Sequence, residues 1–93
     1  MANSKANNFN VEITDIDKKI LNDDLLDINE WIQNAVRGKI NSCWKRMQTK
    51  WTLKLINDED FTDAIPSSKN EFVDFITTHE DYQTRLERES EKI

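Results

Sequence analysis

The side chains that most often carry out catalysis are few in this chain of 93 residues. It contains one cysteine, Cys43, and one histidine, His79. These two cannot build a zinc site of Cys and His ligands, a disulfide or a short Cys–His motif. A single glycine also excludes the phosphate-binding loops GxGxxG and GxxxxGK[ST]. We therefore predict neither a metal site nor a bound cofactor.

Neither of these two residues lies in a setting that suggests nucleophilic chemistry. His79 precedes Glu80 and Asp81 and could titrate, but no Ser or Cys lies at a motif distance from it. We expect a solvated histidine at a helix end. Cys43 lies in an apolar helical stripe, which predicts a small buried hydrophobic side chain rather than a reactive thiol.

The carboxylates are abundant but form no catalytic pattern. The acidic run 58–60 resembles the opening of a calcium loop, but Asp63 stands at the glycine position and Lys69 at the twelfth. Adjacent acids such as Asp23 and Asp24 have no predicted pocket that would shift their pKa values toward catalysis. The sequence therefore predicts no catalytic residue and a non-enzymatic protein.

Composition indicates the elements that position these residues. The chain is 37% hydrophobic and 33% charged, with one Gly and one Pro, which favours a small all-α fold over a turn-rich β fold. We expect a polar arm and extended lead-in over residues 1–13 and a single helical domain over 14–93. Phe9, Val11 and Ile13 alternate with the period of a strand. They either pack locally as an extended segment or add to the sheet edge of a partner.

Helix boundaries follow from capping residues. Three capping pairs stand at predicted helix starts: Thr14 with Asp17, Asp27 with Glu30, and Ser68 with Glu71. In each pair the first side chain can accept a hydrogen bond from the backbone amide of the residue three positions later. The predicted helices are 15–22, 28–55, 69–78 and 81–91.

The second predicted helix is long and carries an apolar stripe. The stripe consists of Ile28, Ile32, Val36, Ile40, Cys43, Met47, Trp51 and Leu55, at steps of three or four residues. We expect the rest of the chain to cover this stripe, with Trp44 and Trp51 in the core. A kink or an early end near residue 50 is one alternative to a continuous helix. Gly38 marks either a close approach by another helix or a tolerated glycine.

Charge is unevenly distributed along the chain. Residues 31–57 carry six cations and no acid, whereas residues 1–30 have a net charge of −4 and residues 58–93 a net charge of −7. A basic strip of Lys39, Arg46 and Lys50 lies within about 40° on one face of the helix. It either binds phosphates beside the tryptophans or is neutralised by the acidic flanking helices.

The chain resembles small uncharacterised all-helical proteins of tailed bacteriophages. The resemblance rests on residues 14–17, 27–35, 38–41, 46–47 and 51, and on 65–66 and 81–85 near the end. It implies a virion-structural, assembly or accessory role. It also implies a location in the host cytoplasm or the virion, and the start of the chain lacks the pattern of a secretion signal.

These observations favour a protein–protein interaction factor. We expect a protein partner or self-association through a partner surface of Trp31, Arg37, Tyr82 and Leu86. A nucleic-acid binder using the basic strip is an alternative. Another is an acidic decoy that uses its C-terminal acids, Glu87, Glu89 and Glu91, to bind a host DNA-binding protein. We expect no membrane and no small-molecule substrate as partner.

Overall fold

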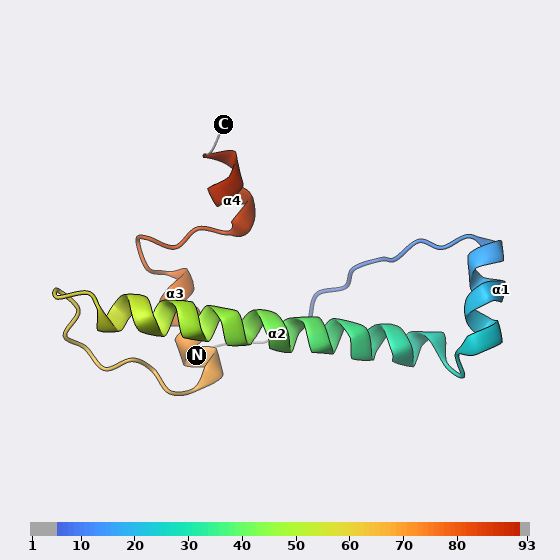
Figure 1. Cartoon of the computed structure of the whole chain (residues 1–93), viewed down its shortest axis with the longest axis horizontal. Helices are drawn as coiled ribbons and strands as arrows, with labels where there is room; N and C mark the ends of the chain where they lie inside the picture. The colour runs from blue at the N-terminus through green and yellow to red at the C-terminus, as the bar shows by residue number, and fades with distance from the viewer. Residues whose placement is uncertain (1–5, 92–93) are drawn as a thin grey trace. The chain divides into compact units, whose positions relative to one another are not determined.

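The fold is all-α. A computed structural model describes residues 6–91, and within this range it contains four helices and no strand. The helices are α1 (Asp15–Asp24), α2 (Ile28–Ile56), α3 (Lys69–Thr77) and α4 (Arg85–Ser90) (Figure 1). The predicted fold class is thereby confirmed.

The predicted caps open the first three helices. The Thr14 hydroxyl accepts a hydrogen bond from the Asp17 amide at 3.1 Å, and the Asp17 carboxylate accepts one from the Thr14 amide. At α2 the Asp27 carboxylate accepts from the Glu30 amide at 3.0 Å. These bonds satisfy amide groups that a helix start leaves without an intrahelical partner.

Helix α2 continues through residue 50 without an interruption. Its end is fixed by a turn, in which the Phe61 amide donates to the Asp58 carbonyl and the Asp58 amide to the Leu55 carbonyl. A Cβ added at Gly38 would meet no atom within 4 Å. The close approach considered for Gly38 is therefore absent among the described residues, and the glycine is one that the helix tolerates.

The described residues divide into two compact units. Within the described residues, one unit comprises residues 6–50 and the other residues 51–91. The boundary lies inside α2, so its first 23 residues belong to the N-terminal unit and its last six to the C-terminal unit.

The C-terminal unit contains all four buried side chains of the described residues. They are Trp51, Leu55, Phe72 and Ile76, and each is at most 5% exposed. Aromatic contacts extend this core, since the Phe61 and Phe75 rings lie 5.9 Å apart and the Trp51 ring lies 6.4 Å from that of Tyr82. The core therefore joins the last turns of α2 to α3 and to the loops on either side of α3.

The N-terminal unit contains no buried side chain among residues 6–50. The expectation that the chain covers the whole apolar stripe is wrong for Val36, Ile40 and Cys43, which are exposed, Val36 by 49% and Ile40 by 41%. Ile28, Ile32 and Met47 are half-buried. Steps of four residues exceed the helical repeat, so the stripe turns by about 180° around α2 between Ile28 and Leu55. The rotation separates Ile28 from Leu55, but it does not account for the exposure of Ile40, which lies only about 20° from Trp51 around the helix.

The lead-in before α1 has neither helix nor strand over residues 6–14. Phe9 and Val11 are 90% and 66% exposed, so the extended segment does not pack its apolar side chains into a core. Residues 1–5 of the predicted polar arm and lead-in, which spans 1–13, lie outside the described residues.

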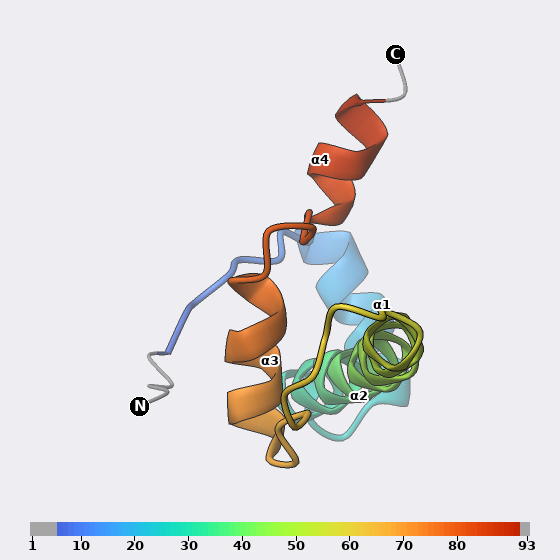
Figure 2. The ribbon, with the colours of Figure 1, turned by 90° about the vertical axis from the view of Figure 1, so that its left-hand side faces the viewer.

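The last helix is shorter than predicted and starts later. We expected a helix over 81–91, but α4 begins at Arg85 because Thr84 and Glu87 form a capping box. Asp81 lies outside the helix, and its carboxylate is 3.5 Å from the Lys54 ammonium. Figure 2 shows α4 extending away from α3 after the connecting loop.

Candidate interaction surface

The six stripe residues of the N-terminal unit form a continuous apolar line on α2, called here the exposed stripe: Ile28, Ile32, Val36, Ile40, Cys43 and Met47. Three of them, Ile28, Ile32 and Met47, are half-buried, and the others are exposed. Capping at Asp27 sets the start of α2, and the helical repeat then places these side chains on one side. Helix α1 makes few contacts with α2, and Val36, Ile40 and Cys43 of this line are exposed.

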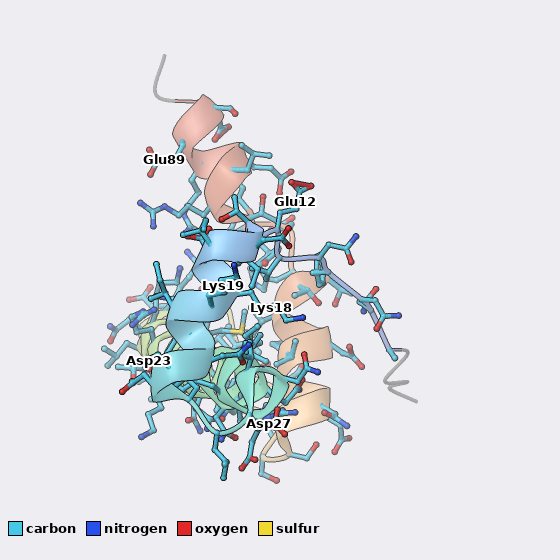
Figure 3. All side chains as sticks on the ribbon, turned by 90° about the vertical axis from the view of Figure 1, so that its right-hand side faces the viewer. Glu12, Lys18, Lys19, Asp23, Asp27 and Glu89 are labelled. Atoms are coloured by element: carbon cyan, nitrogen blue, oxygen red, sulfur yellow. The ribbon has the colours of Figure 1, made fainter. Side chains whose placement is uncertain are left out.

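An open groove adjoins the start of the exposed stripe. It is about 490 Å³ in volume and is lined by residues of the lead-in, α1 and the first turns of α2: Val11, Ile13, Lys18, Asn22, Leu26, Asp27, Ile28, Asn29 and Ile32. Figure 3 labels Lys18 on α1 and Asp27 at the start of α2. Its lining mixes apolar side chains with polar and charged ones, among them Lys18 and Asp27.

Trp31 and Arg37 of the predicted partner surface lie on α2 and are exposed, Trp31 by 55%. They point about 120° apart around the helix, so they do not share a face. Trp31 lines a smaller hollow with Leu26 and Glu30, beside the exposed stripe.

The other two predicted partner residues belong to the C-terminal unit. Tyr82 is half-buried and its ring contacts Trp51, so it contributes to the core. Leu86 is 77% exposed on α4. The four residues are therefore divided between the two units, and only Leu86 and Trp31 offer large exposed apolar side chains.

The basic strip is exposed in the N-terminal unit. Lys39, Arg46 and Lys50 are all exposed, and within residues 6–50 none of them forms an ion pair with an acid. The neutralisation considered for this helix is present only at its end, where Lys54 contacts Asp81 in the C-terminal unit.

Cys43 differs from its prediction. It is exposed instead of buried, and the Arg46 guanidinium donates a hydrogen bond to its Sγ at 3.5 Å. The spacing of the stripe correctly predicted the side of the helix on which Cys43 lies. It could not show that no other part of the chain packs against that side. The thiol therefore remains accessible to reagents.

His79 also differs from its prediction, because it is half-buried rather than solvated. Its ring centroid lies 5.2 Å from that of Trp51 and 6.5 Å from that of Phe75. Its Nδ1 accepts a hydrogen bond from the Asp81 amide at 3.0 Å. The four-residue spacing from Phe75 was the available signal for this packing role. No three His, Cys, Asp or Glu side chains gather in a metal-binding group within residues 6–91.

All three acids considered for a decoy role have local partners, since the Glu89 carboxylate lies 3.8 Å from the Arg85 guanidinium. Hydrogen bonds from the Thr84 backbone amide and hydroxyl lower the pKa of the Glu87 carboxyl below its usual value. Glu91 accepts a hydrogen bond from the Gln83 side chain at 2.6 Å. Hydrogen bonds to Glu87 and Glu91 form at the two ends of α4, so these acids contribute to the structure of the helix as well as to its charge.

No helix among the described residues has both the length and the apolarity needed to span a membrane. In comparisons with protein-family models, curated proteins and solved structures, the chain matches none.

Proposed function

We propose that the protein is a non-enzymatic interaction factor that binds another polypeptide through the exposed stripe of α2. The observation that carries this proposal is the absence of any buried side chain within residues 6–50, although this unit holds a continuous apolar line. Covering apolar surface stabilises a complex by about 25 cal/mol per Å². A contiguous line of this kind is typical of a protein-binding surface.

The biological role that we propose is structural or accessory in the assembly of a tailed bacteriophage. The support is the resemblance of residues 14–17, 27–35 and 81–85 to small phage proteins. Genes for capsid or tail proteins on either side of this gene are the expected finding. Early regulatory genes on both sides would contradict the assembly role and favour the acidic decoy.

The test of binding is crosslinking in the cell that carries the gene. Lys39 and Lys50 lie on the same side of α2 as the exposed stripe, so an amine-reactive reagent is expected to join them to a second polypeptide chain. The double variant Val36→Ser with Ile40→Ser is expected to remove these crosslinks. Asn34→Ser with Asn41→Ser is the matched control, because both asparagines are exposed polar residues on the same helix.

Mass spectrometry identifies the crosslinked lysines and their partners. Crosslinks that are absent from the wild type, or equal in the wild type and the stripe variant, would contradict binding through this surface. A crosslink to a copy of the same chain and one to a different protein both support it.

Nucleic-acid binding is the second candidate, and exposure of the basic strip favours it. Its affinity would fall steeply with salt, because each neutralised phosphate releases counterions. A gel shift at about 50 and 200 mM salt is the measurement. Lys39→Gln with Lys50→Gln should weaken the shift, whereas Lys18→Gln with Lys19→Gln on α1 should not. No shift at low salt contradicts this candidate.

A further inference from the structure

His79 stands at the first position of a tight turn in the loop between α3 and α4 (Figure 2). The Tyr82 amide donates to the His79 carbonyl at 3.0 Å, which closes the turn over residues 79–82. The His79 Nδ1 accepts a hydrogen bond from the Asp81 amide, also at 3.0 Å. Aspartate, asparagine and serine are the residues that usually accept from this amide at the start of a turn. Histidine performs the same task here with an atom that can bind a proton.

This hydrogen bond defines the protonation state of the imidazole. A ring nitrogen that accepts from an N–H group carries a free lone pair, so Nδ1 is unprotonated and the proton of the neutral ring is on Nε2. Protonation places a hydrogen on Nδ1, and two N–H groups then face each other. The turn therefore loses its acceptor when His79 becomes charged.

Three side chains of the turn contact the end of α2. The Trp51 ring centroid lies 5.2 Å from that of His79 and 6.4 Å from that of Tyr82. The Asp81 carboxylate is 3.5 Å from the Lys54 ammonium, and both side chains are about half-exposed. An exposed ion pair of this kind contributes little by itself. The backbone of the turn, which directs all three side chains to α2, therefore keeps them in place.

The charges around His79 oppose one another. From α2, the Lys54 ammonium disfavours a positive imidazole, whereas the Asp81 and Glu80 carboxylates of the turn favour it. The aromatic rings that His79 contacts on α2 and α3 carry no charge. The Tyr82 side chain is a phenol, and phenols are uncharged in the range in which histidines titrate. Loss of the Nδ1 acceptor is therefore the effect that distinguishes the two protonation states of the turn.

We propose that His79 is a pH-sensitive switch, in which protonation of Nδ1 releases the Asp81 amide, opens the 79–82 turn and separates Asp81 from Lys54. The closed turn excludes a proton from Nδ1 and the open turn admits one, so the closed form becomes more stable as the pH rises. The closed turn is expected at about pH 8, and opening is expected on acidification toward about pH 5. The switch lies within the C-terminal unit and is independent of what binds the exposed stripe.

Amide exchange measured by NMR across this pH range tests the switch. After correction for the intrinsic effect of pH on exchange, protection of the Asp81 and Tyr82 amides should fall about tenfold between about pH 8 and pH 5. The reason is that the turn loses one hydrogen bond and gains an unfavourable contact between two donors. Nitrogen-15 signals of the imidazole report its protonation in the same sample. Protection that stays unchanged while the imidazole becomes protonated would overturn the switch.

The amide of Ile76 in α3 is the internal reference. Ile76 is fully buried, so its protection reports whether the C-terminal unit as a whole remains folded. An equal loss of protection at Ile76 and Asp81 would show that the whole unit unfolds, which contradicts a switch confined to the turn. The cap of α4 does not interfere, because hydrogen bonds from Thr84 lower the pKa of Glu87 and so keep its titration below this range.

Two variants separate the acceptor from the aromatic ring. His79→Asn offers a side-chain oxygen to the Asp81 amide and does not titrate, so protection at Asp81 should be independent of pH. His79→Phe keeps an aromatic ring without an acceptor, so protection should be low at both pH values. Pronounced pH dependence in His79→Asn would assign the effect to a neighbouring carboxylate. Full protection in His79→Phe would show that the acceptor is not needed, and either result overturns the proposal.

Discussion

Both units of the chain carry apolar residues on α2, but only the C-terminal unit buries them. Residues 51–91 bury Trp51, Leu55, Phe72 and Ile76, whereas residues 6–50 bury no side chain. Both units carry apolar residues at helical spacing on α2, so apolar content alone does not decide which stripe is covered. The difference is that the C-terminal unit has a second apolar element, α3, whose Phe72 and Ile76 belong to the same core.

The N-terminal unit has no such second element. Helix α1 has its own apolar residues, but Ile16 and Ile20 are each 62% exposed, and α1 makes few contacts with α2. The comparison shows that an amphipathic stripe becomes part of a core only when a second apolar element packs against it. Otherwise it remains available to a partner molecule.

The largest effect is expected from removing a buried core side chain, which tests directly whether the two units differ in packing. Ile76→Ala should destabilise the C-terminal unit by about 3 kcal/mol, because it removes fully buried methyl groups and leaves a cavity. The matched change Ile40→Ala on the exposed stripe should cost less than about 1 kcal/mol in dilute protein. Urea denaturation followed by the NMR amide signals of residues 72–76 and 36–40 measures both. Equal losses would contradict the division into a cored and an uncored unit.

A smaller effect is expected at the cap of α3, the helix that completes the core. The Ser68 hydroxyl accepts from the Glu71 amide at 3.2 Å, and it donates to the Glu71 carboxylate at 2.9 Å. Ser68→Ala should therefore destabilise the C-terminal unit by about 1 kcal/mol. Ser67→Ala is the control, since residue 67 precedes the cap and is exposed. The same loss in both variants would show that the cap does not stabilise α3.

Gly38 offers a stabilising change in the uncored unit. A Cβ at this position meets open space, so Gly38→Ala should stabilise α2 by somewhat less than about 1 kcal/mol through helix propensity alone. The gain should appear as a higher midpoint in thermal denaturation followed by far-ultraviolet circular dichroism. Association through the exposed stripe should not change, because Gly38 points away from it. A loss of helix on this substitution would mean that another element approaches Gly38 after all.

The smallest effect concerns the pH dependence of α4. Because hydrogen bonds from Thr84 lower the pKa of Glu87 in the folded state, the cap stabilises α4 above the ordinary pKa of a glutamate, about 4.3. This stabilisation should be lost as the pH falls through the lowered pKa. A carbon-13 NMR titration of the Glu87 carboxyl follows it. Thr84→Ala should raise the pKa of Glu87 toward its ordinary value, and an unchanged titration would contradict the cap.

The helices of this protein were predictable from the sequence, because their signals are local. Caps such as Thr14 with Asp17 and Ser68 with Glu71 act over three residues, and the structure contains both. The start of α4 was predicted too early, since Asp81 competes with Thr84 as a helix start and only Thr84 is followed three residues on by a reciprocal glutamate. The choice of Thr84 leaves Asp81 free to reach Lys54.

The candidate surface was predictable only in part. The spacing of Ile28 to Met47 correctly placed these residues on one side of α2, but their exposure did not follow from it. Likewise, the sequence identified His79 without showing that Trp51 and Phe75 would pack against it. Trp51 and His79 are 28 positions apart in the chain. Their contact therefore depends on the path of the loop and helix between them, which local sequence patterns do not predict.

By itself the sequence determined the helical class, the caps and the apolar line on α2, since each depends on neighbours within one or two helical turns. Only the tertiary structure decided that the line is buried at Trp51 and Leu55 and exposed at Val36 and Ile40. The physical reason is reach along the helix: α3 supplies Phe72 and Ile76 to the core at the last turns of α2, and Ile40 lies eleven residues, or about 16 Å, before Trp51. A single apolar element packed against one end therefore leaves the other uncovered.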